Sequence, residues 1–265
     1  MLSSVLVTAL TGILFQSVPG AGGGTVARKS ASDELKPLDQ PAASALPTKQ
    51  LPPEQMGDIF MARKRFREAL EEYERCDQNS AVIANKTGIA YHQLLDFRNA
   101  MLEYRRATKL DRHYPEAFNN LGTVYYSRKS YRRAIHLYKT ALRISPNSAT
   151  VYSNLGSAYF SMRRFPDAIG AYQKALSLDP NVFSHASTTG VLLQEQTVED
   201  KALFHYYMAR IYAQAGMNDQ ALQNIRKALE EGFKDRQKFI DEPEFAALKG
   251  NPEFVELMKK EQREL

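Results

Sequence analysis

The chain has 265 residues, of which 35 are basic and 30 acidic, and its formal net charge is +5. One cysteine and five histidines exclude an internal disulfide framework, and they provide no His or Cys pair at the spacing of a metal site. The chain beyond residue 50 is long enough to bury a sizeable core.

The first 27 residues contain no charged side chain and include an apolar run, Val5–Phe15. A membrane-spanning helix needs about 20 apolar residues, so this run has the length of a signal peptide's central region instead. Small residues precede candidate cleavage points after Ala27 and after Ala21. The sequence therefore predicts a signal peptide over 1–27 and an exported, periplasmic or secreted protein with no transmembrane segment after cleavage. No basic residue precedes the run, so an uncleaved membrane anchor and a misplaced start remain alternatives.

Residues 28–50 are rich in serine, alanine, proline and charge and show no apolar period. Such a segment cannot bury enough apolar surface to fold by itself. It is predicted to be a flexible linker.

An internal repeat follows. Gly88, Gly122 and Gly156 are 34 residues apart, and each is followed by tyrosine after three and sixteen positions and by alanine after twelve and nineteen. This period predicts two antiparallel helices per repeat, with small residues where the helices approach and aromatic residues between neighbouring repeats. Pro146 and Pro180 then end the second helix.

Two further repeats are less regular. Gly57 precedes Gly88 by 31 residues, and Ala209 follows Gly156 by 53, which leaves 53 − 34 = 19 inserted residues within 181–201. The insertion is interpreted as a spacer, with a partner-specific loop as the alternative. The repeat array is expected over 51–235, and residues 236–265 are expected to form helices that cap its end.

Two segments of this chain, Asn119–Tyr125 and Ser153–Tyr159, resemble the motif of the tetratricopeptide repeat family. The family's tryptophan at the fourth repeat position is replaced by Phe118 and Tyr152. The resemblance implies an all-α fold, a right-handed α-solenoid of about five helical hairpins with C-terminal capping helices. It implies little about activity.

In such a solenoid the first helix of each repeat lines a concave groove. Amides, hydroxyls and aromatic rings there would suit an extended peptide. The resemblance adds that Asn120 and Asn154 occupy a position where family members often hold a ligand's main chain, although asparagine there is also a common structural hydrogen bonder; Lys86 interrupts this row. The candidate groove residues are Asn85, His92, Asn119, Asn120, Thr123, Tyr126, Ser153, Asn154, Ser157, Phe160, Tyr206 and Arg210.

Basic residues recur at the turn between the two helices of a repeat, and residues 117–166 contain no acid. Stacking would align them as a basic edge that contacts an acidic protein, anionic lipid headgroups or a wall polymer; a solvated edge is the alternative. No nucleic-acid reading motif accompanies them, so nucleic acid is not an expected partner. The basic edge comprises Arg63, Lys64, Arg65, Arg128, Lys129, Arg163 and Arg164.

No nucleophile elbow or phosphate-binding glycine loop is present. We therefore expect no catalytic residue, no metal and no cofactor. The function predicted from sequence is a non-enzymatic scaffold, an exported adaptor or assembly factor that binds another protein or an extended peptide in its groove. The alternative is a structural cell-envelope protein that docks on anionic lipid or wall polymer through the basic edge.

Overall fold

The structure is a computed structural model that describes residues 51–183 and 198–259, all within one compact unit, Gln50–Leu265. The predicted signal peptide and linker, most of the insertion and the last six residues lie outside these ranges. None of the helices in the described ranges is long and apolar enough to span a bilayer.

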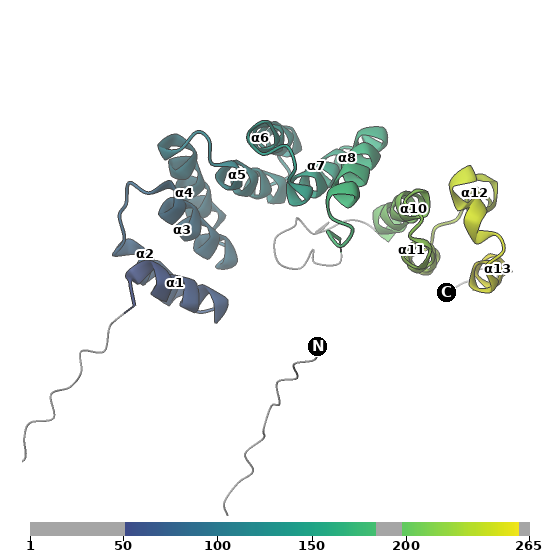
Figure 1. Cartoon of the computed structure of the whole chain (residues 1–265), viewed down its shortest axis with the longest axis horizontal. Helices are drawn as coiled ribbons and strands as arrows, with labels where there is room; N and C mark the ends of the chain where they lie inside the picture. Colours follow the sequence, from purple (N-terminus) through teal and green to yellow (C-terminus); the bar gives the residue numbers. More distant parts are fainter. Residues whose placement is uncertain (1–50, 184–197, 260–265) are drawn as a thin grey trace, which may run out of the picture. The chain divides into compact units, whose positions relative to one another are not determined.

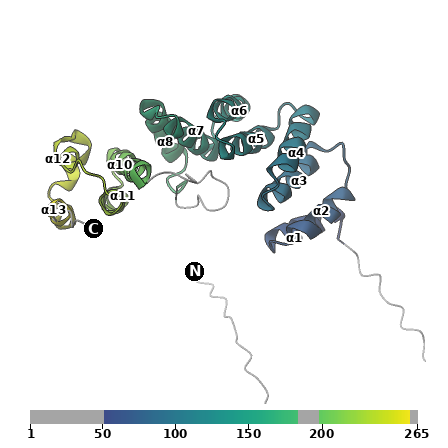
Figure 2. The same ribbon diagram turned by 180° about the vertical axis from the view of Figure 1, so that it is seen from behind.

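The described residues form five antiparallel helical hairpins without a β-strand, and consecutive hairpins pack against each other (Figures 1 and 2). The fold class predicted from the sequence, an all-α solenoid, is confirmed. We number the hairpins as the first to fifth repeats and count repeat positions so that Gly57, Gly88, Gly122, Gly156 and Ala209 occupy position 8. The pairs are α1 (Pro53–Ala62) with α2 (Phe66–Glu74), α3 (Ala81–Gln93) with α4 (Phe97–Leu110), α5 (Pro115–Ser127) with α6 (Tyr131–Ile144), α7 (Ala149–Ser161) with α8 (Phe165–Leu178), and α10 (Val198–Gln214) with α11 (Asn218–Glu230).

Local signals define where these helices begin. Ser80, Asp96 and Ser148 each accept a backbone N–H at the start of α3, α4 and α7, which satisfies a donor that has no partner within the helix. A proline occupies the first turn of α1, α5 and α8, where its missing N–H costs nothing.

Each glycine at position 8 lies against the tyrosine sixteen residues later. A Cβ on Gly156 would lie 2.6 Å from the ring of Tyr172, and the first, second and third repeats give 2.4, 2.6 and 2.7 Å. The fifth repeat changes both residues together, to Ala209 and Ile225, and both are fully buried. Glycine is thus required where the partner is tyrosine.

The turn between the two helices has the same form in every repeat. In the third repeat the N–H of Lys129 bonds to the carbonyl of Tyr126, and that of Ser130 to the carbonyl of Tyr125. This is a Schellman motif, whose residue at position 15 adopts a left-handed conformation. Only the fifth repeat has glycine at position 15. From the first repeat to the fifth, the residues at position 15 are Lys64, Leu95, Lys129, Arg163 and Gly216, and their φ angles lie between 57° and 72°.

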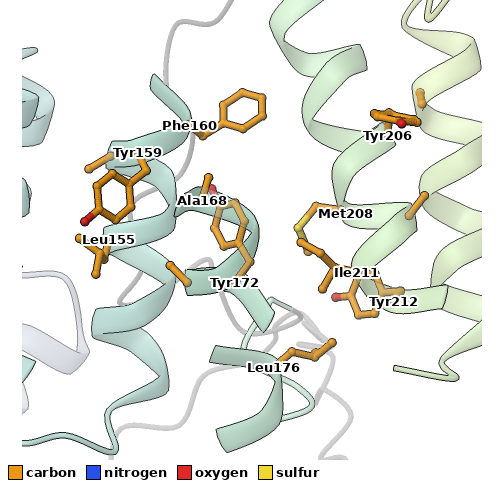
Figure 3. Packing of buried hydrophobic residues seen from close by; sticks show 14 of the residues in the cluster. Leu155, Tyr159, Phe160, Ala168, Tyr172, Leu176, Tyr206, Met208, Ile211 and Tyr212 are labelled. Atoms are coloured by element: carbon orange, nitrogen blue, oxygen red, sulfur yellow. The ribbon is translucent and has the colours of Figure 1, made fainter. Parts of the chain in front are cut away.

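Aromatic side chains join the fourth and fifth repeats across the insertion. Phe165 stacks on Tyr207 with ring centroids 5.1 Å apart, and Phe204 contacts the rings of both Phe160 and Tyr172. Figure 3 shows Phe160 and Tyr172 on the side of their hairpin that faces α10. The buried core is therefore continuous between the fourth and fifth repeats.

Three short helices follow the fifth repeat: α12 (Gln237–Asp241), the 3-10 helix η1 (Pro243–Leu248) and α13 (Pro252–Lys259). They contact α10 and α11 and bury Phe239, Phe245, Leu248 and Phe254. Tyr206 stacks on Phe233 at 4.6 Å and meets Phe239 edge-on. These helices cover an apolar surface that the last repeat of a solenoid would otherwise expose.

Candidate functional site

Asparagine side chains connect the first helices of three repeats. Asn120 Nδ2 donates to Asn85 Oδ1 at 3.0 Å, and Asn154 Nδ2 donates to Asn119 Oδ1 at 2.9 Å. Asn119 Nδ2 lies 3.3 Å from Asn120 Oδ1, and Asn85 Nδ2 donates to the hydroxyl of Tyr114. In each inter-repeat bond, position 6 of one repeat donates to position 5 of the preceding repeat. We call this row the amide ladder.

Lys86 interrupts the row of asparagines but continues the pairing between first helices, a contact that the sequence interpretation did not include. Its Nζ lies 2.8 Å from Glu54 Oε1 and 2.7 Å from Asp58 Oδ2. Lys86 is at position 6 and Glu54 at position 5 of the preceding repeat, so an ion pair takes the place of an amide pair. Burial opposes the charge on Lys86, but the two carboxylates outweigh it and raise its pKa.

Most of the predicted groove residues are not open to solvent. Seven are buried, because neighbouring first helices press together through the ladder and the aromatic contacts. Asn154 is fully buried, and Tyr172 Oη donates to Ser157 Oγ at 3.1 Å. For these seven residues the expectation of an open binding surface is wrong. They are Asn85, Asn119, Tyr126, Asn154, Ser157, Phe160 and Tyr206.

The fifth repeat has no open groove position at Tyr206 and Arg210 either. Arg210 Nε lies 3.1 Å from Glu242 Oε2, and its Nη2 lies 2.5 Å from Glu244 Oε1. The hydroxyl of Tyr206 donates to Glu242. Burial opposes ionisation of Glu244, but the hydrogen bond from Arg210 outweighs it, so the pKa of Glu244 lies below its usual range. The C-terminal helices therefore occupy this part of the predicted groove.

Five predicted groove residues remain partly accessible. They are Arg210, which is held by the two glutamates, and His92, Asn120, Thr123 and Ser153. An asparagine amide has two donor hydrogens and an oxygen with two lone pairs. The ladder uses one donor and one lone pair of Asn120. One donor hydrogen and one oxygen lone pair of Asn120 are left, and the side chain is half-buried. These two groups can hydrogen-bond the C=O and N–H of another polypeptide backbone.

His92 packs against aromatic rings instead of binding a polar partner. Its ring meets Phe97 edge-on at 5.4 Å and Tyr104 at 6.5 Å. Burial lowers the pKa of His92, so the folded protein favours the neutral ring.

This burial predicts a pH dependence of stability. Because the pKa of His92 is lower in the folded state than the value of about 6.5 for an unfolded chain, stability is complete above that pH and falls as the pH drops through it. A His92→Phe variant keeps the edge-on contacts and should lose less melting temperature between pH 7.5 and pH 5.5 than the wild type. Parallel melting curves check this; equal losses would contradict it.

The basic edge is exposed along all seven residues. Arg65 pairs with Glu68, Arg164 with Asp167 and Arg163 with Asp200, at 2.9, 2.8 and 3.1 Å. Such exposed pairs are worth about 0–1 kcal/mol. The edge therefore presents a net excess of positive charge whose existing partners are weakly held.

Sequence reasoning missed two features of these surfaces. The ion pairs of Arg210 with Glu242 and Glu244 were not predicted. Both glutamates lie within one repeat length after the end of the fifth repeat. Leu94 and Leu95 occupy the turn of the second repeat where neighbouring repeats have basic residues, and aligning the turns by position would have found them. Within the described residues no group of three or more His, Cys, Asp or Glu is placed to hold a metal.

Comparison with known proteins supports the repeat assignment. A family model described as "TPR repeat" matches residues 88–129 and 122–162, and one described as "Tetratricopeptide repeat" matches 149–182. No curated protein matches the sequence.

Solved structures of several repeat proteins resemble the chain. MamA from Desulfovibrio magneticus RS-1 is 21% identical, with 68% of this chain and 92% of that chain covered and a TM-score of 0.48. A second MamA structure is 23% identical, with 69% and 97% covered and a TM-score of 0.46. The first repeat domain of Spaghetti (RPAP3), bound to an HSP90 peptide, is 20% identical, with 42% and 90% covered and a TM-score of 0.41. Taken with the helical hairpins, the family models show that residues 88–182 of this chain are tetratricopeptide repeats.

Proposed function

We propose that the protein is a non-enzymatic scaffold that binds an extended peptide, or an extended segment of another protein, along the first helices of the second to fourth repeats. The tetratricopeptide repeats support a role as a protein-interaction scaffold. The location of the binding site and the extended peptide as its ligand are our proposal. The single observation that carries it is the spare donor and acceptor of Asn120 in a half-buried position.

The neighbours of Asn120 support main-chain recognition. Thr123 lies one turn after Asn120 on α5, and Ser153 lies on α7 of the next repeat; both are half-buried, so a hydroxyl is available on the same helix as the amide and another on the neighbouring repeat. The ladder fixes the amides before any ligand arrives, so binding orders the peptide but not the receptor. We also propose that the protein acts as an adaptor or assembly factor outside the cytoplasm, because residues 1–27 have the composition of an export signal.

A bulky charge in the groove should abolish peptide binding. Ser153→Arg introduces a long cation at a half-buried position of α7. Ser177→Arg places the same side chain on the exposed outer face of α8, in the same hairpin, and serves as the matched control. An array of synthetic peptides is probed with the wild type and both variants after circular dichroism confirms that each is folded.

We expect peptides retained by the wild type to be lost by Ser153→Arg, by about tenfold or more in affinity, since a clash and an unpaired charge together cost over 1.4 kcal/mol. Ser177→Arg should bind as the wild type does. Peptides that bind all three proteins equally, or an array on which the wild type retains nothing, would refute binding in the groove.

We propose a second function, docking of the basic edge on an anionic surface. It is supported by the full exposure of the seven basic residues. Binding to such a surface should fall as salt rises and should be lost when Arg128, Lys129, Arg163 and Arg164 are changed to glutamine. Binding that ignores both salt and these four residues would exclude it.

A further inference from the structure

The second repeat has two leucines at its turn. Leu95 is 72% exposed and has a φ of 61°, and Leu94 is 37% exposed. The N–H of Leu95 bonds to the carbonyl of His92 and that of Asp96 to the carbonyl of Tyr91, so the turn has the same Schellman geometry as the others. The two leucines therefore occupy the positions that Lys129 and its neighbour occupy in the third repeat.

Leu95 combines two unfavourable features. A non-glycine residue in the left-handed conformation costs about 1–2 kcal/mol, and its side chain stays in water. Gly216 fills the same position of the fifth repeat, so the turn itself does not require a side chain. Leu95 is not among the described residues that pack on the core. Strain at an exposed apolar tip indicates a role outside the fold.

Basic turns flank the leucine turn on both sides. Arg63 and Lys64 precede it in the first repeat, and Arg128 and Lys129 follow it in the third. Because these turns share one geometry and consecutive hairpins pack together, their tips lie along one edge. The edge thus carries an apolar tip between positively charged tips.

We propose that this edge docks on a bilayer containing anionic phospholipids, with Leu94 and Leu95 entering the boundary between headgroups and acyl chains. This rests on the second proposed function and identifies its surface as lipid. A bilayer presents phosphates above an apolar layer, which matches cations beside a protruding leucine pair. An acidic polypeptide or wall polymer would complement the charges and leave the leucines without a partner.

The basic side chains of the edge contribute to binding an anionic bilayer. Each Lys or Arg close to an anionic leaflet adds about 1 kcal/mol of attraction, which falls off within a Debye length. The ion pairs of Arg65, Arg163 and Arg164 are exposed, so exchanging a carboxylate for a lipid phosphate loses little.

The test is co-sedimentation of the full chain with vesicles of phosphatidylcholine and with vesicles that also contain phosphatidylglycerol. The measured quantity is the increase in binding from neutral to anionic vesicles. Residues 1–27 are identical in the wild type and in every variant, so a difference in binding between the wild type and a variant does not come from them.

Leu94→Gln combined with Leu95→Gly should reduce the increase about tenfold, because two leucines no longer enter the interface. Leu95→Gly alone relieves backbone strain and should raise the melting temperature while it lowers vesicle binding. A loss of binding then cannot reflect unfolding. Leu102→Gln removes a leucine that is 52% exposed on α4, away from the edge, and should leave binding unchanged.

The quadruple glutamine variant of Arg128, Lys129, Arg163 and Arg164 separates this inference from the function on which it rests. If that variant loses binding to vesicles and to polyglutamate while the leucine variants bind vesicles as the wild type does, docking on anionic surfaces stands and leucine insertion is wrong. If wild-type binding is the same for neutral and anionic vesicles and polyglutamate is not bound, both are wrong.

Discussion

Replacing Gly156 by alanine is expected to destabilise the protein by about 2 kcal/mol, although alanine is the better helix former by about 1 kcal/mol. The added Cβ would lie 2.6 Å from two ring carbons of Tyr172. That ring is 1% exposed and its hydroxyl is bonded to Ser157, so it cannot move aside. Forcing extra volume into such a core costs about 1–3 kcal/mol. Urea unfolding followed by circular dichroism measures the loss.

The chain supplies both a control and a rescue for this experiment. Gly170 lies on α8 with no atom within 4 Å of its would-be Cβ, so Gly170→Ala should stabilise by about 1 kcal/mol. Tyr172→Ile alone should destabilise by leaving a cavity. The double variant Gly156→Ala with Tyr172→Ile recreates the Ala209 and Ile225 pair of the fifth repeat. It should be more stable than the sum of the single changes predicts, and strict additivity would refute the steric account.

Replacing Arg210 by methionine is expected to destabilise the protein by about 2–3 kcal/mol. Glu242 and Glu244 would be left beside each other without a cation, and removing one partner from a buried ion pair costs roughly 3–5 kcal/mol. The expected loss is smaller because the Glu242 side chain is 21% exposed. The last helices should open first, so hydrogen exchange over 237–259 should accelerate more than exchange over the third repeat.

Arg226 is the matched control for Arg210. It also joins the fifth repeat to the C-terminal helices, through Glu253 at 2.5 Å, but the two side chains are 51% and 42% exposed. Arg226→Met should change stability by no more than about 1 kcal/mol. The loss caused by Arg210→Met should shrink as the pH falls toward 4, because protonation removes the uncompensated charges. A loss that is independent of pH would exclude this electrostatic explanation.

The sequence was sufficient to predict the hairpins because their determinants are local and repeated. Gly122 and Tyr138 are sixteen residues apart, and a distance that recurs in every repeat can be read without knowing the stack. The same reasoning locates the first helices that line the groove. It does not say how closely neighbouring first helices approach, and that approach decides whether Asn119 is a surface amide or a buried one.

The features that escaped prediction depend on pairs of residues whose types change from repeat to repeat. Lys86 looked like a break in a row of asparagines, since its partner Glu54 is recognisable only once position 6 is known to contact position 5 of the preceding repeat. Glu244 follows no repeat register, so nothing in its spacing connects it with Arg210. In the structure, a charged pair and an amide pair both join the first helices of neighbouring repeats. In the sequence, the two pairs have no residue type in common and look unrelated.

The amide ladder has a consequence for how the molecule could be lengthened. The third repeat holds an asparagine at both position 5 and position 6, as Asn119 and Asn120, so it carries both halves of the joint between neighbours. A second copy of residues 115–148 spliced in directly after the first would meet its original through an amide pair identical in kind to those already present. Growth by duplication would then need no compensating change anywhere else, whereas copying the fourth repeat would place Asn154 opposite Ser153 and leave the new seam mismatched.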